Sequence, residues 1–145
     1  MSATGYFMSK NELQLYIDGA SKGNPGHSGI GVIILKDGQT VKNLSHYIGK
    51  ATNNAAEYTA LIFGLQEGLL LKAEELTIYT DSELLYKQVN GLYKVRDANI
   101  ACLYNQAMRL MKGFKKVSVN HIPREQNSGA DKLATIAVKE ALKRA

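Results

Sequence analysis

The sequence predicts an α/β fold in which a mixed five-stranded sheet carries helices on its faces. Two features of the 145-residue chain support this prediction. Residues 13–48 contain three apolar segments with strand character, and no helical period interrupts them. From residue 53 onward, segments with a helical period alternate with two short apolar strands. The first three strands then form an antiparallel meander, and helical crossovers bring in the later strands parallel to their neighbours.

The first three strands are expected within residues 13–48. Apolar and polar residues alternate over 13–17, which is typical of a strand with one buried face. Residues 18–26 are small and glycine-rich and predict a loop. A β-branched run over 29–35 predicts the second strand, and an Asp-Gly pair at 37–38 predicts a hairpin. Residues 40–48 then return as the third strand.

The later elements follow from caps and periodicity. Asn53 or Asn54 can cap a helix that runs to about Lys72, and Ser82 can cap another helix. Apolar residues from 130 to 142 recur at helical spacing and predict an amphipathic last helix. The expected ranges are 53–72 for the first helix, 76–80 for the fourth strand, 98–111 for the third helix and 116–120 for the fifth strand.

Composition sets the broad class. Residues 1–10 are expected to form a flexible tail and residues 11–145 a single domain. The single cysteine, Cys102, excludes an intrachain disulfide and favours a reducing, cytoplasmic location. No apolar run is long enough to span a membrane. Residues 82–145 hold 12 Lys and Arg against 5 Asp and Glu, which suggests an anionic partner such as nucleic acid. On charge alone, a solvated and soluble surface is the preferred explanation.

Four carboxylates fall at the ends or beginnings of predicted elements. Asp18 ends the first strand and Asp81 ends the fourth, so parallel pairing would place both at one edge of the sheet. Glu57 and Asp131 lie in the first turns of two helices. Each residue alone has a structural explanation, because carboxylates stabilise helix N-termini. Four converging carboxylates would repel one another unless a cation such as Mg²⁺ compensated, and two such ions can promote phosphodiester hydrolysis.

The residues around these carboxylates carry a family resemblance. The motifs are YIDGASKGNPG at 16–26, TNNAAE at 52–57, YTDS at 79–82 and ADKLA at 130–134. With these motifs in order, the sequence resembles type 1 ribonuclease H, the endonuclease that cuts the RNA strand of an RNA/DNA hybrid. The resemblance extends from about residue 13 to residue 142. It implies a ribonuclease H-like fold.

The resemblance also implies a catalytic and metal-binding quartet of Asp18, Glu57, Asp81 and Asp131. Asp18 and Asp81 would contact two Mg²⁺ ions when substrate is bound, with Mn²⁺ as a possible substitute. Glu57 would help to hold one ion and the adjoining ribose, and Asp131 would help to hold the ion that activates water. The expected products carry 3′-hydroxyl and 5′-phosphate ends. The expected partner is the hybrid itself, with no membrane or protein partner and a monomeric enzyme.

Substrate contacts follow from the same resemblance. Gly19, Ala20 and Ser21 would bring backbone close to the RNA strand. Asn24, Asn53 and Asn54 would contact that strand in the minor groove, and Thr52 would grip a phosphate of the DNA strand. Contacts to 2′-hydroxyl groups let a protein distinguish RNA from DNA. The residues concerned are Gly19, Ala20, Ser21, Asn24, Thr52, Asn53 and Asn54.

The chain departs from many relatives in three places. Residues 85–97 are short and lack the long basic, tryptophan-containing extension, so the chain resembles the subgroup without it. Glu83 stands where relatives often carry glutamine. His121 keeps a ten-residue spacing to the last aspartate but lacks the flanking glycine of a mobile loop, so Arg124 is a second candidate for a catalytic or phosphate-binding role. Asn127 is expected to cap the last helix.

Two alternatives to a hybrid-cutting nuclease remain open from the sequence. A fold of this type can serve as a non-catalytic nucleic-acid-binding module, because fold alone does not determine function. A nuclease that prefers double-stranded RNA is the other alternative, because the asparagine pair reads only one strand as RNA. The complete quartet argues against the first alternative.

Overall fold

The computed structural model describes residues 11–144, and the tail expected over residues 1–10 lies outside the described residues. The elements follow one another as β1 (Glu12–Gly23), β2 (Gly26–Lys36), β3 (Gln39–Ala51), α2 (Asn53–Leu70), β4 (Glu75–Thr80), α3 (Glu83–Val89), α4 (Ala98–Met111), β5 (Lys116–His121), the short 3₁₀ helix η1 (Arg124–Gln126) and α5 (Ser128–Lys143).

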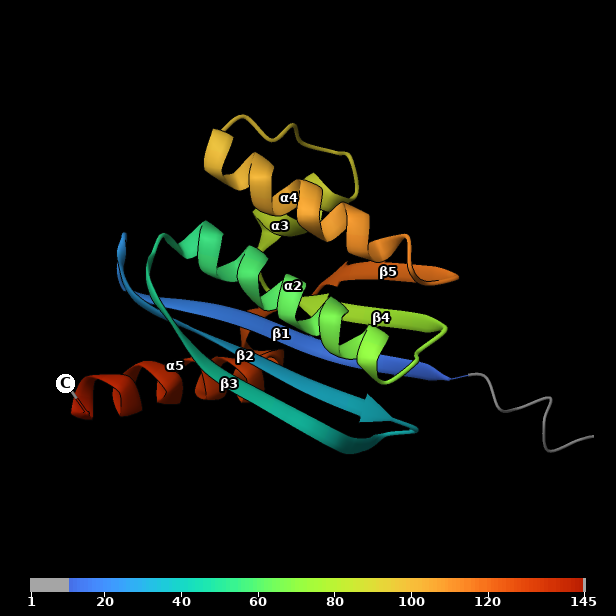
Figure 1. Ribbon diagram of the computed structural model, residues 1–145, viewed down its shortest axis with the longest axis horizontal. Helices are drawn as coiled ribbons and strands as arrows, with labels where there is room; N and C mark the ends of the chain where they lie inside the picture. Colours follow the sequence, from blue (N-terminus) through green and yellow to red (C-terminus); the bar gives the residue numbers. More distant parts are fainter. Residues whose placement is uncertain (1–10, 145) are drawn as a thin grey trace, which may run out of the picture.

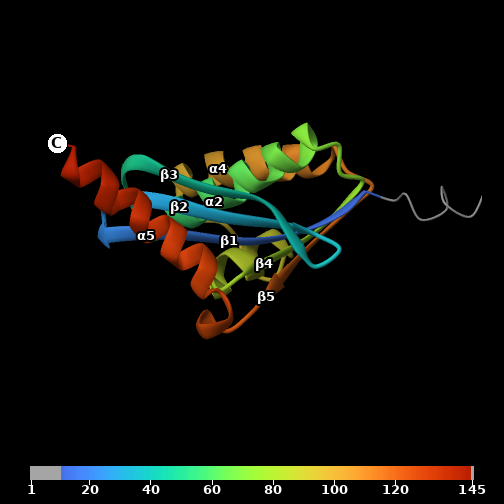
Figure 2. The same cartoon turned by 90° about the horizontal axis from the view of Figure 1, so that it is seen from below.

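The sheet confirms the predicted mixed architecture. Its strand order is β3-β2-β1-β4-β5, with β1, β2 and β3 antiparallel and β1, β4 and β5 parallel. Helices α2 and α4 cover one face, and α5 packs against the other face (Figures 1 and 2). The pairing of β1 with β4 ends at Ile17 and Thr80, so Asp18 and Asp81 follow side by side. Among the described residues, no helix is both long and apolar enough to cross a membrane.

The core lies between the sheet and α2. Alternating residues of β1 point into it, and α2 contributes the face that covers them. This side holds the fully buried side chains Leu15, Ile17, Ile78, Tyr58, Leu61 and Leu65. Burial of each large apolar side chain contributes about 1.5–3 kcal/mol, so the core also anchors β1, which carries Asp18, and β4, which Asp81 follows.

Strand β1 is longer than the sequence pattern predicts. The expected loop over 18–26 is wrong, because β1 continues to Gly23 and pairs with β2 through to the register Gly23↔Gly26. Small residues have low strand propensity, but the neighbouring strand supplies hydrogen-bond partners along the whole hairpin. The turn itself is reduced to Asn24 and Pro25. The site residues after Asp18 are thus held in a paired strand.

Two glycines of β2 let α5 approach the sheet closely. A Cβ at Gly31 would lie 2.1 Å from the carbonyl oxygen of Ala130, and one at Gly29 would lie 2.5 Å from that of Ala134. Both distances are below any real van der Waals contact, so only glycine permits this approach. This packing fixes the position of Asp131 at the start of α5.

Caps set where the helices around the site begin. Thr52 caps α2, because its hydroxyl accepts from the backbone N–H of Ala55 at 3.1 Å; the expected Asn53 or Asn54 cap is wrong by one or two residues. Ser82 caps α3 as predicted, accepting from Leu85 N–H at 3.2 Å. Threonine and asparagine are both favourable N-cap residues, so the sequence alone does not distinguish the neighbouring candidates.

Candidate active site

Three carboxylates from separate elements meet at the sheet edge. Asp18 comes from β1, Glu57 from α2, and Asp81 follows β4 directly. One carboxylate oxygen from each lies within 4.8 Å of the others. The parallel pairing Ile17↔Thr80 explains this proximity, because it places the next residue of each strand side by side. Asp18 is only 5% exposed.

Asp131 completes the cluster from the other face of the sheet. It lies in the first turn of α5, and its carboxylate contributes to raising the pKa of Asp18. A cavity of about 440 Å³ contains all four acidic side chains. Its lining residues are Asp18, Gly19, Ala20, Ser21, Asn53, Glu57, Asp81, Arg124 and Asp131. We call this cavity the acidic pocket.

Burial and mutual repulsion make the acidic pocket unfavourable for charge. Desolvation, and then the neighbouring Glu57 and Asp81, raise the pKa of Asp18 well above its ordinary value. Desolvation also raises the pKa of Glu57, although the backbone N–H of Gly19 and the charge of Arg124 act in the opposite direction. An all-oxygen donor set with this excess of negative charge fits a hard divalent cation such as Mg²⁺.

Gly19 holds Glu57 in place. Its backbone N–H donates to Glu57 Oε1 at 2.8 Å. A Cβ at Gly19 would lie 2.3 Å from the backbone carbonyl carbon of Ala56, so any other residue would push β1 away from α2. The glycine after the first aspartate therefore permits both the close packing and the hydrogen bond.

Asn127 is a site residue that sequence reasoning missed. It occupies the N-cap position of α5 as expected, but its side chain makes no capping hydrogen bond. Its Nδ2 instead donates to the carbonyl oxygen of Ile17 at 2.8 Å and to Asp81 Oδ2 at 3.3 Å, and the residue is 1% exposed. An asparagine just before a helix ordinarily indicates a cap. Only the fold brings two acceptors to its buried side.

The structure distinguishes Arg124 from His121, the two candidates for a catalytic or phosphate-binding role in the region before α5. Arg124, in η1, lines the acidic pocket and acts electrostatically on Glu57. His121 ends β5, is exposed, and packs its ring against Tyr86 at a centroid distance of 5.9 Å. His121 does not line the acidic pocket.

The expected substrate-binding residues lie in two groups. Gly19, Ala20, Ser21 and Asn53 line the acidic pocket. Asn24 lies beside it, and its Oδ1 accepts from the backbone N–H of Asn53 at 3.0 Å. The remaining two residues are Thr52, which caps α2, and Asn54, which lines a second cavity of about 570 Å³.

Residues 85–97, the short segment in place of the long basic extension, contribute most of the lining of this second cavity. Tyr93, Lys94 and Arg96 line it together with Asn54. Lys87 lies outside the cavity lining and is engaged locally: its Nζ is 3.3 Å from Glu83 Oε2 and 4.7 Å from the centroid of the Tyr93 ring. Glu83 therefore pairs with a lysine on its own helix.

Comparisons with known proteins agree with this geometry. The family model described as "Reverse transcriptase-like" matches residues 16–137. "Bifunctional protein Rv2228c" of Mycobacterium tuberculosis is 40% identical over 126 residues, which cover 86% of this chain but 35% of that protein. "Ribonuclease H" of Coxiella burnetii is 32% identical, over 93% of this chain and 95% of that protein. The chain thus spans about a third of the length of the mycobacterial relative and nearly all of the Coxiella one.

A solved structure adds a ligand-bound neighbour. The crystal structure of LC11-RNase H1 in complex with an RNA/DNA hybrid superposes with a TM-score of 0.85. It is 36% identical to this chain and covers 90% of it, and the match covers 99% of that protein.

Proposed function

Because the chain belongs to the ribonuclease H family, we propose that it is a metal-dependent endonuclease that hydrolyses the RNA strand of RNA/DNA hybrids. The observation that carries this proposal is the acidic pocket, in which four carboxylates from both faces of one sheet edge converge. A hybrid-bound relative with the same fold supports the substrate. The expected products have 3′-hydroxyl and 5′-phosphate ends.

We assign Asp18, Glu57, Asp81 and Asp131 to metal binding. Bound divalent ions, Mg²⁺ first and Mn²⁺ as a substitute, would supply the Lewis acidity that activates water and stabilises the leaving oxygen. The protein contributes the fixed geometry. Gly19 N–H orients Glu57, and the core-anchored strands hold Asp18 beside Asp81. Such preorganisation keeps the ligands in place without reorganisation during the reaction.

Substrate recognition is assigned to the rim of the acidic pocket. Gly19, Ala20 and Ser21 present backbone at the pocket wall, where the RNA strand can approach closely. Asn24 and Asn53 are coupled by a hydrogen bond and would act as one unit in the minor groove.

Next to Asn53, Asn54 would reach the RNA strand in the minor groove, and Thr52 would contact a phosphate of the DNA strand. The cavity that Asn54 shares with Lys94 and Arg96 offers positive charge for its phosphates.

We propose that Arg124 binds a substrate or product phosphate. It is the cation that lines the acidic pocket, and guanidinium binds phosphate oxygens in a bidentate fashion. Replacement by lysine keeps the charge but loses the bidentate geometry. We therefore expect Arg124→Ala to reduce turnover strongly and Arg124→Lys to restore only part of it, as measured in single-turnover cleavage. Full activity of Arg124→Ala would remove this assignment.

A cleavage assay tests the main proposal. Labelled RNA/DNA hybrid, double-stranded RNA, double-stranded DNA and single-stranded RNA are incubated with Mg²⁺, with Mn²⁺ or with chelator. Asp81→Asn serves as the control variant, because it keeps the shape of the side chain and removes its charge. We expect cleavage of the hybrid's RNA strand alone, lost with chelator and in the variant.

Three outcomes would contradict the proposal or one of its assignments. Cleavage of double-stranded RNA in preference to the hybrid would identify a different nuclease. Binding of the hybrid without cleavage would identify a non-catalytic binding module. Near wild-type activity in Asp81→Asn would exclude the metal-binding role of that residue.

A further inference from the structure

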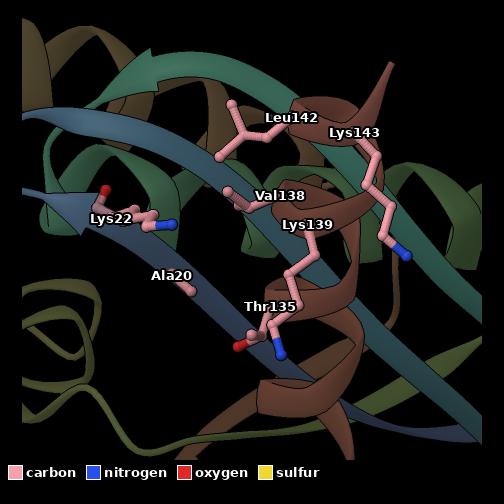
Figure 3. A pocket seen from close by; sticks show the side chains of 8 residues that line it. Ala20, Lys22, Thr135, Val138, Lys139, Leu142 and Lys143 are labelled. Carbon is pink, nitrogen blue, oxygen red and sulfur yellow. The ribbon is translucent and has the colours of Figure 1, made fainter. Parts of the chain in front are cut away.

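A second groove adjoins the acidic pocket. It has a volume of about 580 Å³ and lies between the end of β1 and the C-terminal half of α5 (Figure 3). Ala20 and Ser21 line both the groove and the acidic pocket. The two hollows are therefore neighbours along one strand. The remaining lining residues are Lys22, Thr135, Val138, Lys139, Leu142 and Lys143.

The groove and the acidic pocket lie along the same faces of the same two elements. On β1, residues two apart share a face, so Lys22 shares the face of Asp18 about 13 Å further along the strand. On α5, Lys139 lies eight residues after Asp131, which is about 12 Å along the helix. Both elements thus carry an acidic residue at the pocket end and lysine at the groove end.

The groove combines an apolar floor with unpaired positive charge. Ala20, Val138 and Leu142 form the floor, and Val138 is only 5% exposed. Within residues 11–144, neither Lys139 nor Lys143 forms an ion pair. Both lysines are exposed and lie one turn apart on α5.

We propose that this groove is an extended substrate subsite, in which the nucleic-acid strand that enters the acidic pocket continues along α5. The phosphates would contact Lys22, Lys139 and Lys143, and the sugars would pack on the apolar floor. A sugar–phosphate backbone suits this surface, because it offers negative charge and apolar faces in alternation. A sequence-independent contact of this kind supplies affinity and register. The inference rests on the proposed function.

The test is the double variant Lys139→Ala/Lys143→Ala. Both residues lie outside the acidic pocket, so its carboxylates stay unchanged. The control variant Lys36→Ala/Lys72→Ala removes the same charge from the opposite end of the molecule. The variant Lys139→Arg/Lys143→Arg keeps the charge. Urea unfolding of all variants checks that the fold is retained.

Binding is measured by fluorescence anisotropy with an RNA/DNA hybrid in chelator, over a series of salt concentrations. We expect Kd to rise about ten-fold at low salt in the double alanine variant, and the slope of log K against log salt to fall by about 2. The arginine variant should match wild type. In steady-state cleavage, the alanine variant should raise KM and leave kcat unchanged.

Equal Kd values and salt slopes in the α5 variant (Lys139→Ala/Lys143→Ala) and the control variant would overturn the proposal. The groove would then not bind the substrate. Failure of the proposed function is distinguishable, because wild-type protein itself would then not cleave the RNA strand of the hybrid. A second arm compares a long hybrid with one too short to reach from the acidic pocket into the groove. The effect of the α5 variant should disappear with the short hybrid.

Discussion

The replacement Asp18→Asn should stabilise the metal-free protein at alkaline pH. Asp18 is buried beside Glu57 and Asp81, and burial together with these neighbours raises its pKa above the ordinary value of 3.8. A carboxyl group with a raised folded-state pKa holds its proton in the fold at pH values where the unfolded chain has released it. Its contribution to stability is therefore fully present below about pH 4 and is lost as pH rises toward the folded-state value. Asparagine has no such dependence.

The size of the effect follows from the geometry. Two unit charges 4.8 Å apart repel by about 3.5 kcal/mol at an effective dielectric constant of about 20. The three carboxylate oxygens lie within that distance, so ionising Asp18 in the fold would cost at least about 3 kcal/mol. Keeping its proton instead costs about 1.4 kcal/mol for each pH unit above 3.8, so a difference of at least about 3 kcal/mol is expected at about pH 8. For a chain of 145 residues this corresponds to a rise in Tm of roughly 10 °C.

Urea unfolding in chelator, at about pH 4 and at about pH 8, measures the effect. We expect the free energies of unfolding of wild type and Asp18→Asn to be similar at the lower pH and to diverge at the higher one. Added Mg²⁺ should stabilise wild type at the higher pH and have little effect on the variant. A difference that does not change with pH, or a less stable variant, would refute the electrostatic reasoning.

Three further outcomes test other parts of the structure. His121→Ala should lower single-turnover cleavage far less than Asp81→Asn, since His121 lies outside the acidic pocket; equal losses would contradict the geometry. Gly31→Ala should lower the free energy of unfolding by more than about 2 kcal/mol, because the new Cβ would collide with the Ala130 carbonyl oxygen; unchanged urea unfolding would contradict that contact. Asn127→Ala should lower stability by about 1–3 kcal/mol and weaken Mg²⁺ binding in calorimetry, because a buried backbone carbonyl of β1 loses its donor and the Asp81 carboxylate loses a tether; wild-type values for both would exclude the positioning role.

Local patterns predicted the order and type of the elements correctly, because burial of one face imposes a period of two on strands and 3.6 on helices. The same patterns failed where long-range pairing overrides local preference. Residues 18–23 are small and read as a loop, yet hydrogen bonds to β2 hold them as strand. The α2 cap was misplaced by a residue or two because Thr52 and Asn53 are equivalent local signals.

The candidate site shows the same division. Motif and element ends were enough to identify Asp18 and Asp81, because parallel strands bring their carboxyl ends to one edge. The sequence offered His121 and Arg124 on equal terms, and only the path of the chain after β5 brings Arg124 to the acidic pocket. Asn127 was predicted only as a helix cap, because nothing in the local sequence indicates that its side chain meets Ile17, 110 residues away, or Asp81, 46 residues away.

By itself, then, the sequence determined the strand and helix order, the family resemblance and the four carboxylates, since these depend on periodicity and short motifs. The tertiary structure alone decided how these residues act on one another. The raised pKa of Asp18, the hydrogen bond from Asn127 to Ile17 and the lysine groove beside the acidic pocket all arise from contacts between β1 and elements distant in sequence. Such contacts depend on burial and relative position, which a linear pattern of residues does not contain.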